Sequence, residues 1–251
     1  MTFETLTAET RDGICTVTMT REHSGNVLSA ALLAELDHVV ARAEAADGPS
    51  VLVLTGGARV FCAGGDFQAL AEGDGILDPA PLYALWQRLA TGPFVSVAVT
   101  RGRVNAGGVG LAAACDIVLA ESGASFALSE LLFGLYPACV LPFLIRRVGE
   151  QRAHYLTLST QPVGAETALS WGLVDAIEDP VESLLRKHLL RLKRLSKPAI
   201  AAYKQYRAHL SPSLDAARPA ALAANRAMFD DPGLRAGIRR YVTEGTFPWE
   251  G

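Results

Sequence analysis

The stretch VLVLTGGARVFCAGGDF, residues 51–67, decides the fold of this chain. Its first four residues, Val51–Leu54, form a continuous run of valine and leucine, which predicts a strand buried on both faces. A glycine-rich turn, Cys62–Asp66, follows within a few residues. Buried strands that lead into such turns are typical of sheets covered by helices on both faces.

A second stretch has the same character. NAGGVGLAAACDIVL, residues 105–119, begins with a small, glycine-rich segment over 105–113 and continues into a predicted strand over 114–119. Residues 94–99 (FVSVAV) form another apolar run just before it and predict a further buried strand. We therefore expect a set of buried strands with a glycine-rich turn after at least two of them.

Helical patterns separate these strands. Leucine and valine recur every three or four residues between Ser29 and Ala46, which predicts an amphipathic helix. Residues 82–90 predict a second helix, and the alternating residues 14–19 (ICTVTM) predict a half-buried strand. Strands that alternate with helices indicate an α/β fold with mostly parallel strands.

The C-terminal part has a different pattern. Helical periodicity begins at Val181, breaks at Lys197-Pro198 and continues in alanine-rich segments to about Met228. We therefore predict a core over residues 1–195 and a C-terminal α-helical region over 196–251. Residues 72–81 (EGDGILDPAP) are rich in acids, glycine and proline and predict a mobile surface loop.

Composition excludes several classes of protein. The 251 residues are 50% hydrophobic and 20% charged, with a net charge of −3, which favours an ordered globule over a nucleic-acid or membrane-surface binder. Four scattered cysteines and five histidines outside any metal-binding motif argue against a disulfide scaffold and a metal site. Without a signal-peptide pattern or a long apolar span, we expect a cytoplasmic protein.

The glycine turns are candidate sites of chemistry. Free N–H groups at two such turns, aimed at one point, would form an oxyanion hole. The alternative is that both turns are merely tight connections between strands and helices. Neither turn matches a dinucleotide-binding or Walker pattern, so a nucleotide-phosphate site is poorly supported.

Glu130 is the carboxylate with the most unusual surroundings. It lies in ALSELLFG, residues 127–134, with no basic residue near it in sequence. An acid among apolar neighbours loses solvation, which raises its pKa toward the range useful for proton transfer. The alternative is a carboxylate at the start of a helix, held by backbone N–H groups.

An ordered set of motifs along nearly the whole chain resembles the enoyl-CoA hydratase/isomerase, or crotonase, superfamily. The set comprises Asn26 before a helix, VLVLTG (51–56), FCAGGD (61–66), AGGVGLAAACD (106–116), SELLFGLYP (129–137) and SWGLVD (170–175). The resemblance implies a spiral of ββα units with C-terminal helices that form a homotrimer or a dimer of trimers. It also implies an acyl thioester substrate on a phosphopantetheine arm and no other cofactor.

The same resemblance assigns roles to individual residues. It implies that Gly65 and Gly107 supply the oxyanion N–H groups and that Glu130 handles the α-proton. Hydratases of the superfamily carry a second, water-activating glutamate where this chain has Gly110. The expected substrate-binding residues are Ala63, Asp66, Tyr83, Gly108, Tyr136, Cys139 and Lys204.

A narrower resemblance is carried by GRVNAGGVG (102–110), the segment 124–149 and the ending RYVTEGTFPWE (240–250). These look like the dehydratases of polyketide β-branching cassettes, which convert 3-hydroxy-3-methylglutaryl on an acyl carrier protein to the 3-methylglutaconyl thioester. The resemblance implies a hydro-lyase of polyketide (antibiotic) biosynthesis. A CoA-linked hydratase or isomerase, the decarboxylase of the same cassettes and a non-catalytic scaffold remain alternatives.

The substrate's distal carboxylate needs a partner. Arg88, Lys204 and Tyr83 are candidates that the sequence does not rank, and each can equally be a surface or packing residue. Asn105 and Ser129 flank the key turns and could donate hydrogen bonds, but the roles that we expect of them are a turn and a helix cap.

Overall fold

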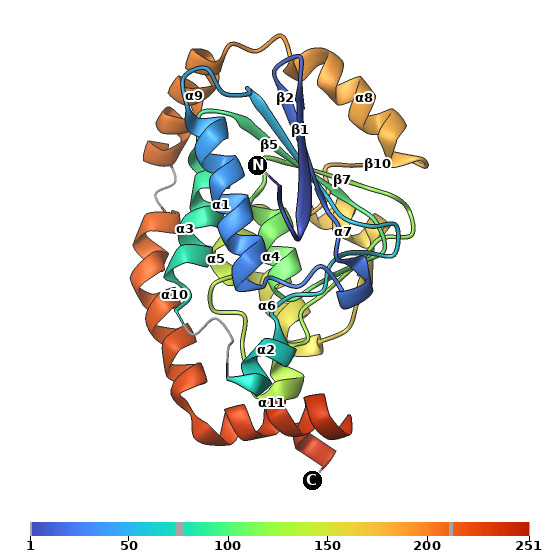
Figure 1. The fold of residues 1–251 in the computed structure, drawn as a ribbon, viewed down its shortest axis with the longest axis vertical. Coiled ribbons are helices and arrows are strands. Elements are labelled where there is room, and N and C mark those ends of the chain that lie inside the picture. The colour runs from blue at the N-terminus through green and yellow to red at the C-terminus, as the bar shows by residue number, and fades with distance from the viewer. Residues whose placement is uncertain (1, 74–77, 211–212, 251) are drawn as a thin grey trace.

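The structure is a computed structural model that describes residues 2–73, 78–210 and 213–250 (Figure 1). Two sheets form its centre. The larger runs β1-β2-β3-β5-β7-β10, and the smaller runs β4-β6-β8-β9. Most neighbouring strands are parallel, and only β1·β2 and β8·β9 pair antiparallel among the described strands.

The larger sheet contains the buried strands that the sequence predicts. Its members are β1 (Leu6–Arg11), β2 (Ile14–Met19), β3 (Val51–Thr55), β5 (Val95–Thr100), β7 (Ile117–Ala120) and β10 (Ala176–Ile177). Leu52 and Leu54 face the main core, whereas Val51 and Val53 face a second apolar cluster beneath α8 (Val181–Leu192). Both faces of β3 are therefore covered, which explains its unbroken apolar sequence.

The smaller sheet is built from short strands, three of which directly follow a strand of the larger sheet. They are β4 (Val60–Cys62), β6 (Arg103–Asn105), β8 (Ser125–Ala127) and β9 (Val163–Gly164). Between β3 and α5 the chain thus repeats three times a strand of the larger sheet, a strand of the smaller sheet and then helical structure. This is the spiral of ββα units of the crotonase fold.

Helices cover the two sheets. Those of the first two thirds are α1 (Ala30–Glu44), α2 (Phe67–Glu72), α3 (Ala80–Thr91), α4 (Gly107–Ala114), α5 (Leu141–Val148), α6 (Glu150–Ser159) and α7 (Ala165–Trp171). Short 3-10 helices occupy Glu22–Ser24 (η1), Glu130–Phe133 (η2) and Pro248–Glu250 (η3). None of the helices formed by described residues is long and apolar enough to cross a bilayer.

After α8, three helices complete the chain: α9 (Lys197–Leu210), α10 (Ser213–Asp230) and α11 (Pro232–Glu244). Figure 1 shows α10 running along one side of the molecule and α11 passing beside α2. Leu214 and Leu222 of α10 belong to the same buried cluster as the sheet. The C-terminal helices are therefore packed on the core, and the predicted boundary at 195/196 falls in the turn before α9.

Most predicted elements are confirmed, with shifts at their ends. Ser29 is the N-cap of α1, and its side chain accepts a hydrogen bond from the Leu32 N–H at 3.2 Å. The predicted strand over 114–119 was wrong at its start, because Ala114 still belongs to α4 and β7 begins at Ile117. Helical structure also extends beyond Met228, through α11.

The predicted loop over 72–81 is only partly visible. Glu72 ends α2 and Ala80 begins α3, so the segment does connect two helices. Residues 74–77 lie outside the described part of the chain, and the expectation of mobility stays a prediction.

Candidate active site

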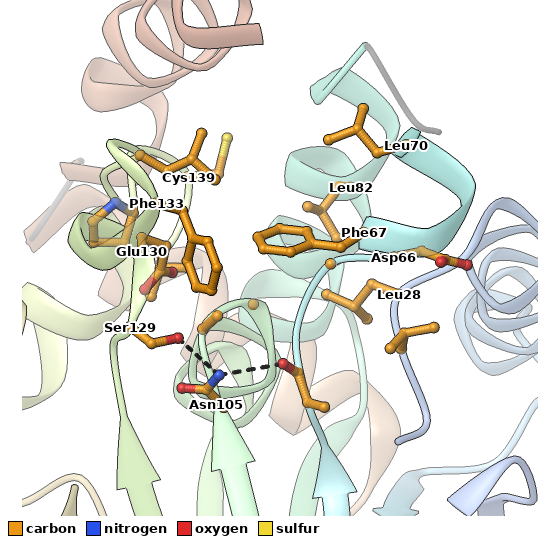
Figure 2. A pocket seen from close by; sticks show the side chains of 18 of the residues that line it. Leu28, Asp66, Phe67, Leu70, Leu82, Asn105, Ser129, Glu130, Phe133 and Cys139 are labelled. Carbon is orange, nitrogen blue, oxygen red and sulfur yellow. Dashed lines mark hydrogen bonds between the residues drawn. The ribbon is translucent and has the colours of Figure 1, made fainter. Parts of the chain in front are cut away.

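A cavity of about 780 Å³ lies where the short strands of the smaller sheet end. The segments after β4, β6 and β8 supply one wall, and α10 and α11 supply another. Figure 2 shows three strands rising toward the labelled side chains. The carboxyl ends of parallel strands thus meet at one place, as in other α/β sites.

The two glycine turns touch each other at the floor of the cavity. Gly64 has φ +105°, and a Cβ on it would lie 2.8 Å from the Ala106 Cβ and 3.4 Å from the Gly107 nitrogen. Glycine is therefore required at position 64 both for its backbone angle and for this contact. Among the described residues, we find no hydrogen-bond acceptor for the N–H of Gly65 or Gly107.

The backbone at the second turn is held in an unfavourable conformation. Ala106 has φ +50° and ψ −120°, a region that residues with a Cβ rarely adopt. Such an outlier costs about 1–3 kcal/mol and persists where the surroundings enforce it. Here it directs the chain from β6 into the first turn of α4, where Gly107 begins the helix with a free N–H.

Glu130 begins η2 and faces the cavity (Figure 2). Its Oε2 is shielded from solvent and has no hydrogen-bond partner among the described residues. Burial raises the pKa of the Glu130 carboxyl to about 7, against a smaller lowering by the residue's own backbone N–H. A carboxyl with this pKa can both take and return a proton near neutral pH.

Asn105 and Ser129 form a polar pair below Glu130. The Asn105 Nδ2 donates to Ser129 Oγ at 3.0 Å and more weakly to the Ala63 carbonyl at 3.5 Å, and both bonds are drawn in Figure 2. The expected helix cap at Ser129 was wrong, because its side chain makes no capping bond to η2. The hydroxyl is instead turned toward Asn105.

Comparisons with known proteins identify the family. The model of the enoyl-CoA hydratase/isomerase family matches residues 9–251. The chain belongs to this family. With hydratases and dehydratases among its relatives, it is a hydro-lyase of the enoyl-CoA hydratase type.

Two relatives show how far the similarity of sequence extends along the chain. A bacillaene synthase dehydratase, PksH, from Bacillus subtilis (strain 168) is 46% identical over 255 residues, covering 100% of this chain and 98% of the relative. A 2,3-dehydroadipyl-CoA hydratase from Escherichia coli (strain K12) is 32% identical over 217 residues, covering 85% of this chain and 84% of the relative.

Solved structures agree in fold. The crystal structure of a polyketide biosynthesis enoyl-CoA hydratase (pksH) from Bacillus subtilis has a TM-score of 0.94 at 46% identity and covers 98% of this chain and 100% of its own. An enoyl-CoA hydratase/isomerase from Xanthobacter autotrophicus Py2 has a TM-score of 0.87 at 24% identity, covering 97% of this chain and 95% of its own. The latter supports the fold alone.

The structure explains why this member of the family has glycine at position 110. A Cβ there would lie 2.4 Å from the Trp86 ring, so any larger side chain collides with a fully buried indole. Trp86 also lines the cavity, and its Nε1 has no acceptor among the described residues. The place of a second carboxylate is therefore filled by tryptophan.

Seven of the ten predicted site residues line the cavity. They are Ala63, Gly65, Asp66, Gly107, Glu130, Tyr136 and Cys139. The carboxylate of Asp66 caps α2 by accepting from the Ala69 N–H at 3.0 Å. Burial raises the pKa of the Cys139 thiol to about 11, so this cysteine is a neutral wall residue near neutral pH.

The other three predicted residues lie outside the cavity wall. A Cβ on Gly108 would lie 2.3 Å from the Cys62 carbonyl oxygen, so this glycine packs α4 against β4. Tyr83 is fully buried and donates to the Leu214 carbonyl at 2.7 Å, which ties α3 to α10. Lys204 is buried elsewhere and pairs with Asp116 at 2.6 Å.

None of the three candidates for binding the distal carboxylate lines the cavity. Tyr83 and Lys204 lie where just described, and Arg88 pairs with Glu44 at 2.7 Å and with Asp37. Their existing partners satisfy these groups. The lysine and arginine side chains that do line the cavity, among the described residues, are Arg21 and Arg103.

A group of aromatic side chains that line the cavity was not predicted from the sequence. Phe67 of α2 meets Phe133 of η2 edge-on, with ring centroids 5.0 Å apart, and Figure 2 shows the two rings as neighbours. Tyr241 and Phe247 from the end of the chain pack on Phe133 at 4.8 and 5.4 Å. Nothing local in the sequence links residues 67, 133 and 241, because only the return of α11 beside α2 brings them together.

Proposed function

We propose that this protein dehydrates 3-hydroxy-3-methylglutaryl carried on an acyl carrier protein to the 3-methylglutaconyl thioester. The observation that carries the proposal is a single carboxylate, that of Glu130, whose shielded Oε2 has no partner among the described residues and which shares a cavity with Gly65 and Gly107. The N–H groups of these two glycines have no acceptor among the described residues. The 46% identity to a dehydratase of bacillaene synthase supports a polyketide substrate.

The reaction follows from that arrangement. The two amides donate hydrogen bonds to the thioester oxygen and stabilise the enolate that forms when the α-proton leaves. The Glu130 carboxylate takes this proton as the Cα–H bond breaks. The Cα=Cβ bond then forms while the Cβ–O bond breaks, and Glu130 returns the proton to the departing hydroxyl. Water leaves, and the carboxylate is regenerated.

One carboxylate is enough when the elimination is syn. The proton that Glu130 takes from Cα is then the proton that it returns to the departing hydroxyl on the same face, so no second acid or base takes part. The pKa of about 7 lets Glu130 act as base and then as acid near neutral pH. Trp86, which closes the space above Gly110, is compatible with dehydration because that space holds no reacting group in this scheme.

The proposed partner is an acyl carrier protein, whose phosphopantetheine arm would enter the cavity. We also expect a homotrimer or a dimer of trimers, as the family resemblance implies. Exposed apolar side chains on α8 and α9, among them Leu190 at 56% and Tyr206 at 63% exposure, are candidates for covered surface. Light scattering on the purified protein would measure the oligomeric state.

Intact-mass spectrometry of the loaded carrier protein tests the function. After incubation with the enzyme, the carrier should lose the mass of one water and no carbon dioxide. Loss of carbon dioxide would identify a decarboxylase instead. An unchanged carrier, with turnover of hydroxyacyl- or enoyl-CoA, would assign the protein to the CoA-linked hydratases.

A further inference from the structure

The side-chain amide of Asn105 points its Nδ2 toward both Ser129 and Ala63. Its Nδ2 faces the Ala63 carbonyl, which can accept a hydrogen bond but cannot donate one. Rotating the amide by 180° would set two acceptor oxygens against each other. The oxygen Oδ1 therefore points away from Ala63, and no donor among the described residues bonds to it although it is buried.

The hydrogen bond from Asn105 leaves the hydroxyl hydrogen of Ser129 available for donation. Its Oγ accepts from Asn105 at 3.0 Å and makes no bond to the backbone of η2. A hydroxyl that accepts one hydrogen bond can still donate its own proton. Asn105 and Ser129 together thus offer one acceptor and one donor, and both residues line the cavity.

This pair lies next to the reacting carboxylate. Ser129 directly precedes Glu130, and Figure 2 shows its hydroxyl between the Asn105 amide and the Glu130 side chain. Buried polar groups without partners are rare in folded proteins, and each calls for an explanation. Among the described residues, four of them belong to side chains that line this cavity: Asn26 Oδ1, Trp86 Nε1, Asn105 Oδ1 and Glu130 Oε2. The side chains of the last two lie on either side of the Ser129 hydroxyl (Figure 2).

A ligand that satisfies this pair needs one group that both donates and accepts. In a 3-hydroxyacyl thioester, the acyl chain has one such group, the β-hydroxyl. The thioester oxygen and an ionised distal carboxylate only accept hydrogen bonds. The pair therefore matches the group that must leave in a dehydration.

We propose that Asn105 and Ser129 hold the β-hydroxyl of the substrate beside Glu130, a role that rests on the proposed dehydration. Asn105 Oδ1 accepts the hydroxyl proton and so turns a lone pair of the oxygen toward Glu130. The Ser129 hydroxyl donates to the same oxygen and stabilises the negative charge that develops as the Cβ–O bond breaks. The proton that completes the departing water still comes from Glu130.

The test separates removal of the α-proton from departure of the hydroxyl. The variants are Ser129→Ala, Asn105→Leu and the conservative Ser129→Thr. Each is assayed for dehydration of 3-hydroxy-3-methylglutaryl-loaded carrier protein and for exchange of the α-hydrogen of 3-methylglutaryl-loaded carrier protein in D₂O. The second substrate has no leaving group, so its exchange needs Glu130 and the two amides alone.

Ser129→Ala and Asn105→Leu should lower the dehydration kcat by about tenfold or more, the loss expected for one hydrogen bond made in the transition state. Hydrogen exchange should stay within about threefold of wild type, and Ser129→Thr should restore most of the dehydration rate. Circular dichroism spectra and thermal midpoints show whether each variant is folded, and Ser129→Ala decides the matter if Asn105→Leu is not.

Three results would overturn the inference. Unchanged dehydration in Ser129→Ala and Asn105→Leu would remove the pair from the reaction. An equal fall in dehydration and exchange would show that the pair only supports Glu130 or the turn. A wild-type enzyme that exchanges the α-hydrogen but releases no water from the hydroxylated substrate would instead refute the proposed function, and this inference with it.

Discussion

The ammonium of Lys204 and the carboxylate of Glu130 lie in two regions of this protein and differ in how completely they are satisfied. At the amino ends of β5 and β7, the Lys204 ammonium donates to the carbonyls of Leu89 and Phe94 at 3.3 and 2.7 Å and pairs with Asp116 at 2.6 Å. At the carboxyl ends of the smaller sheet, Glu130 Oε2 and Asn105 Oδ1 have no partner among the described residues.

This difference distinguishes a charged group that stabilises the fold from one that can take part in a reaction. The three donors of Lys204 have three acceptors, so no capacity is left for a ligand. Burial lowers the pKa of Lys204, and Asp116 opposes that effect. For Glu130 nothing comparable offsets burial, so its pKa rises to about 7. Burial acts on both side chains, and Glu130 is marked as a site of chemistry by its missing partner together with the cavity that it faces.

The largest effect should come from Glu130→Gln. The amide keeps the shape of the side chain but cannot take the α-proton, so the dehydration kcat should fall about 10²–10⁴-fold. The fold should remain. Because the ionised carboxylate is disfavoured by burial, the variant should unfold at the same or higher urea concentration than wild type above pH 7. Turnover close to wild type would contradict the assigned role.

The pH dependence of the dehydration rate should report the ionisation of Glu130. Glu130 must be ionised to act as base, and its pKa is about 7. Below that value the ionised fraction, and with it kcat/KM, should fall about tenfold for each pH unit. Rates measured from pH 5 to 8 on the loaded carrier protein test this. An acid limb centred near 4.5 would mean that burial does not perturb the carboxyl.

Asp116→Asn should lower the stability of the protein and leave its activity nearly unchanged. It leaves the buried ammonium of Lys204 without its counterion, and breaking such a pair costs about 3 kcal/mol of unfolding free energy. The kcat should stay within about twofold of wild type, because this region lies outside the cavity. Urea unfolding and the carrier assay measure the two quantities. A large loss of kcat in a stable variant would mean that both regions serve catalysis.

Sequence patterns predicted the glycine turns and Glu130 but not the side chains that surround them. The glycine turns and Glu130 could be found because turn geometry and an isolated acid leave local signals in the sequence. Lys204 and Tyr83 have side chains that are able to bind a carboxylate. Only the tertiary structure shows that Lys204 already pairs with Asp116 and that Tyr83 already donates to the Leu214 carbonyl. Phe247 is brought to the cavity by the fold of α11, for which no local pattern exists.

Gly110→Ala tests how tightly the place of the second carboxylate is closed. The new Cβ would lie 2.4 Å from the Trp86 ring, and overpacking of this kind costs about 1–3 kcal/mol of unfolding free energy. Thermal and urea unfolding measure the loss. Adding Trp86→Phe, which shortens the ring system, should recover part of it. If Gly110→Ala is as stable as wild type, the indole yields readily and does not explain the missing glutamate.

Tyr83→Phe should produce the smallest change. The phenol is fully buried and its hydroxyl donates to the Leu214 carbonyl, so the variant loses one hydrogen bond and leaves that carbonyl to find another donor. A loss of about 1 kcal/mol in unfolding free energy is expected. Neither KM nor kcat for the loaded carrier protein should move by more than about twofold, because the hydroxyl faces α10 and not the cavity. A raised KM with unchanged stability would place Tyr83 among the substrate contacts, and would show that a satisfied polar group in this protein can still exchange its partner for a ligand.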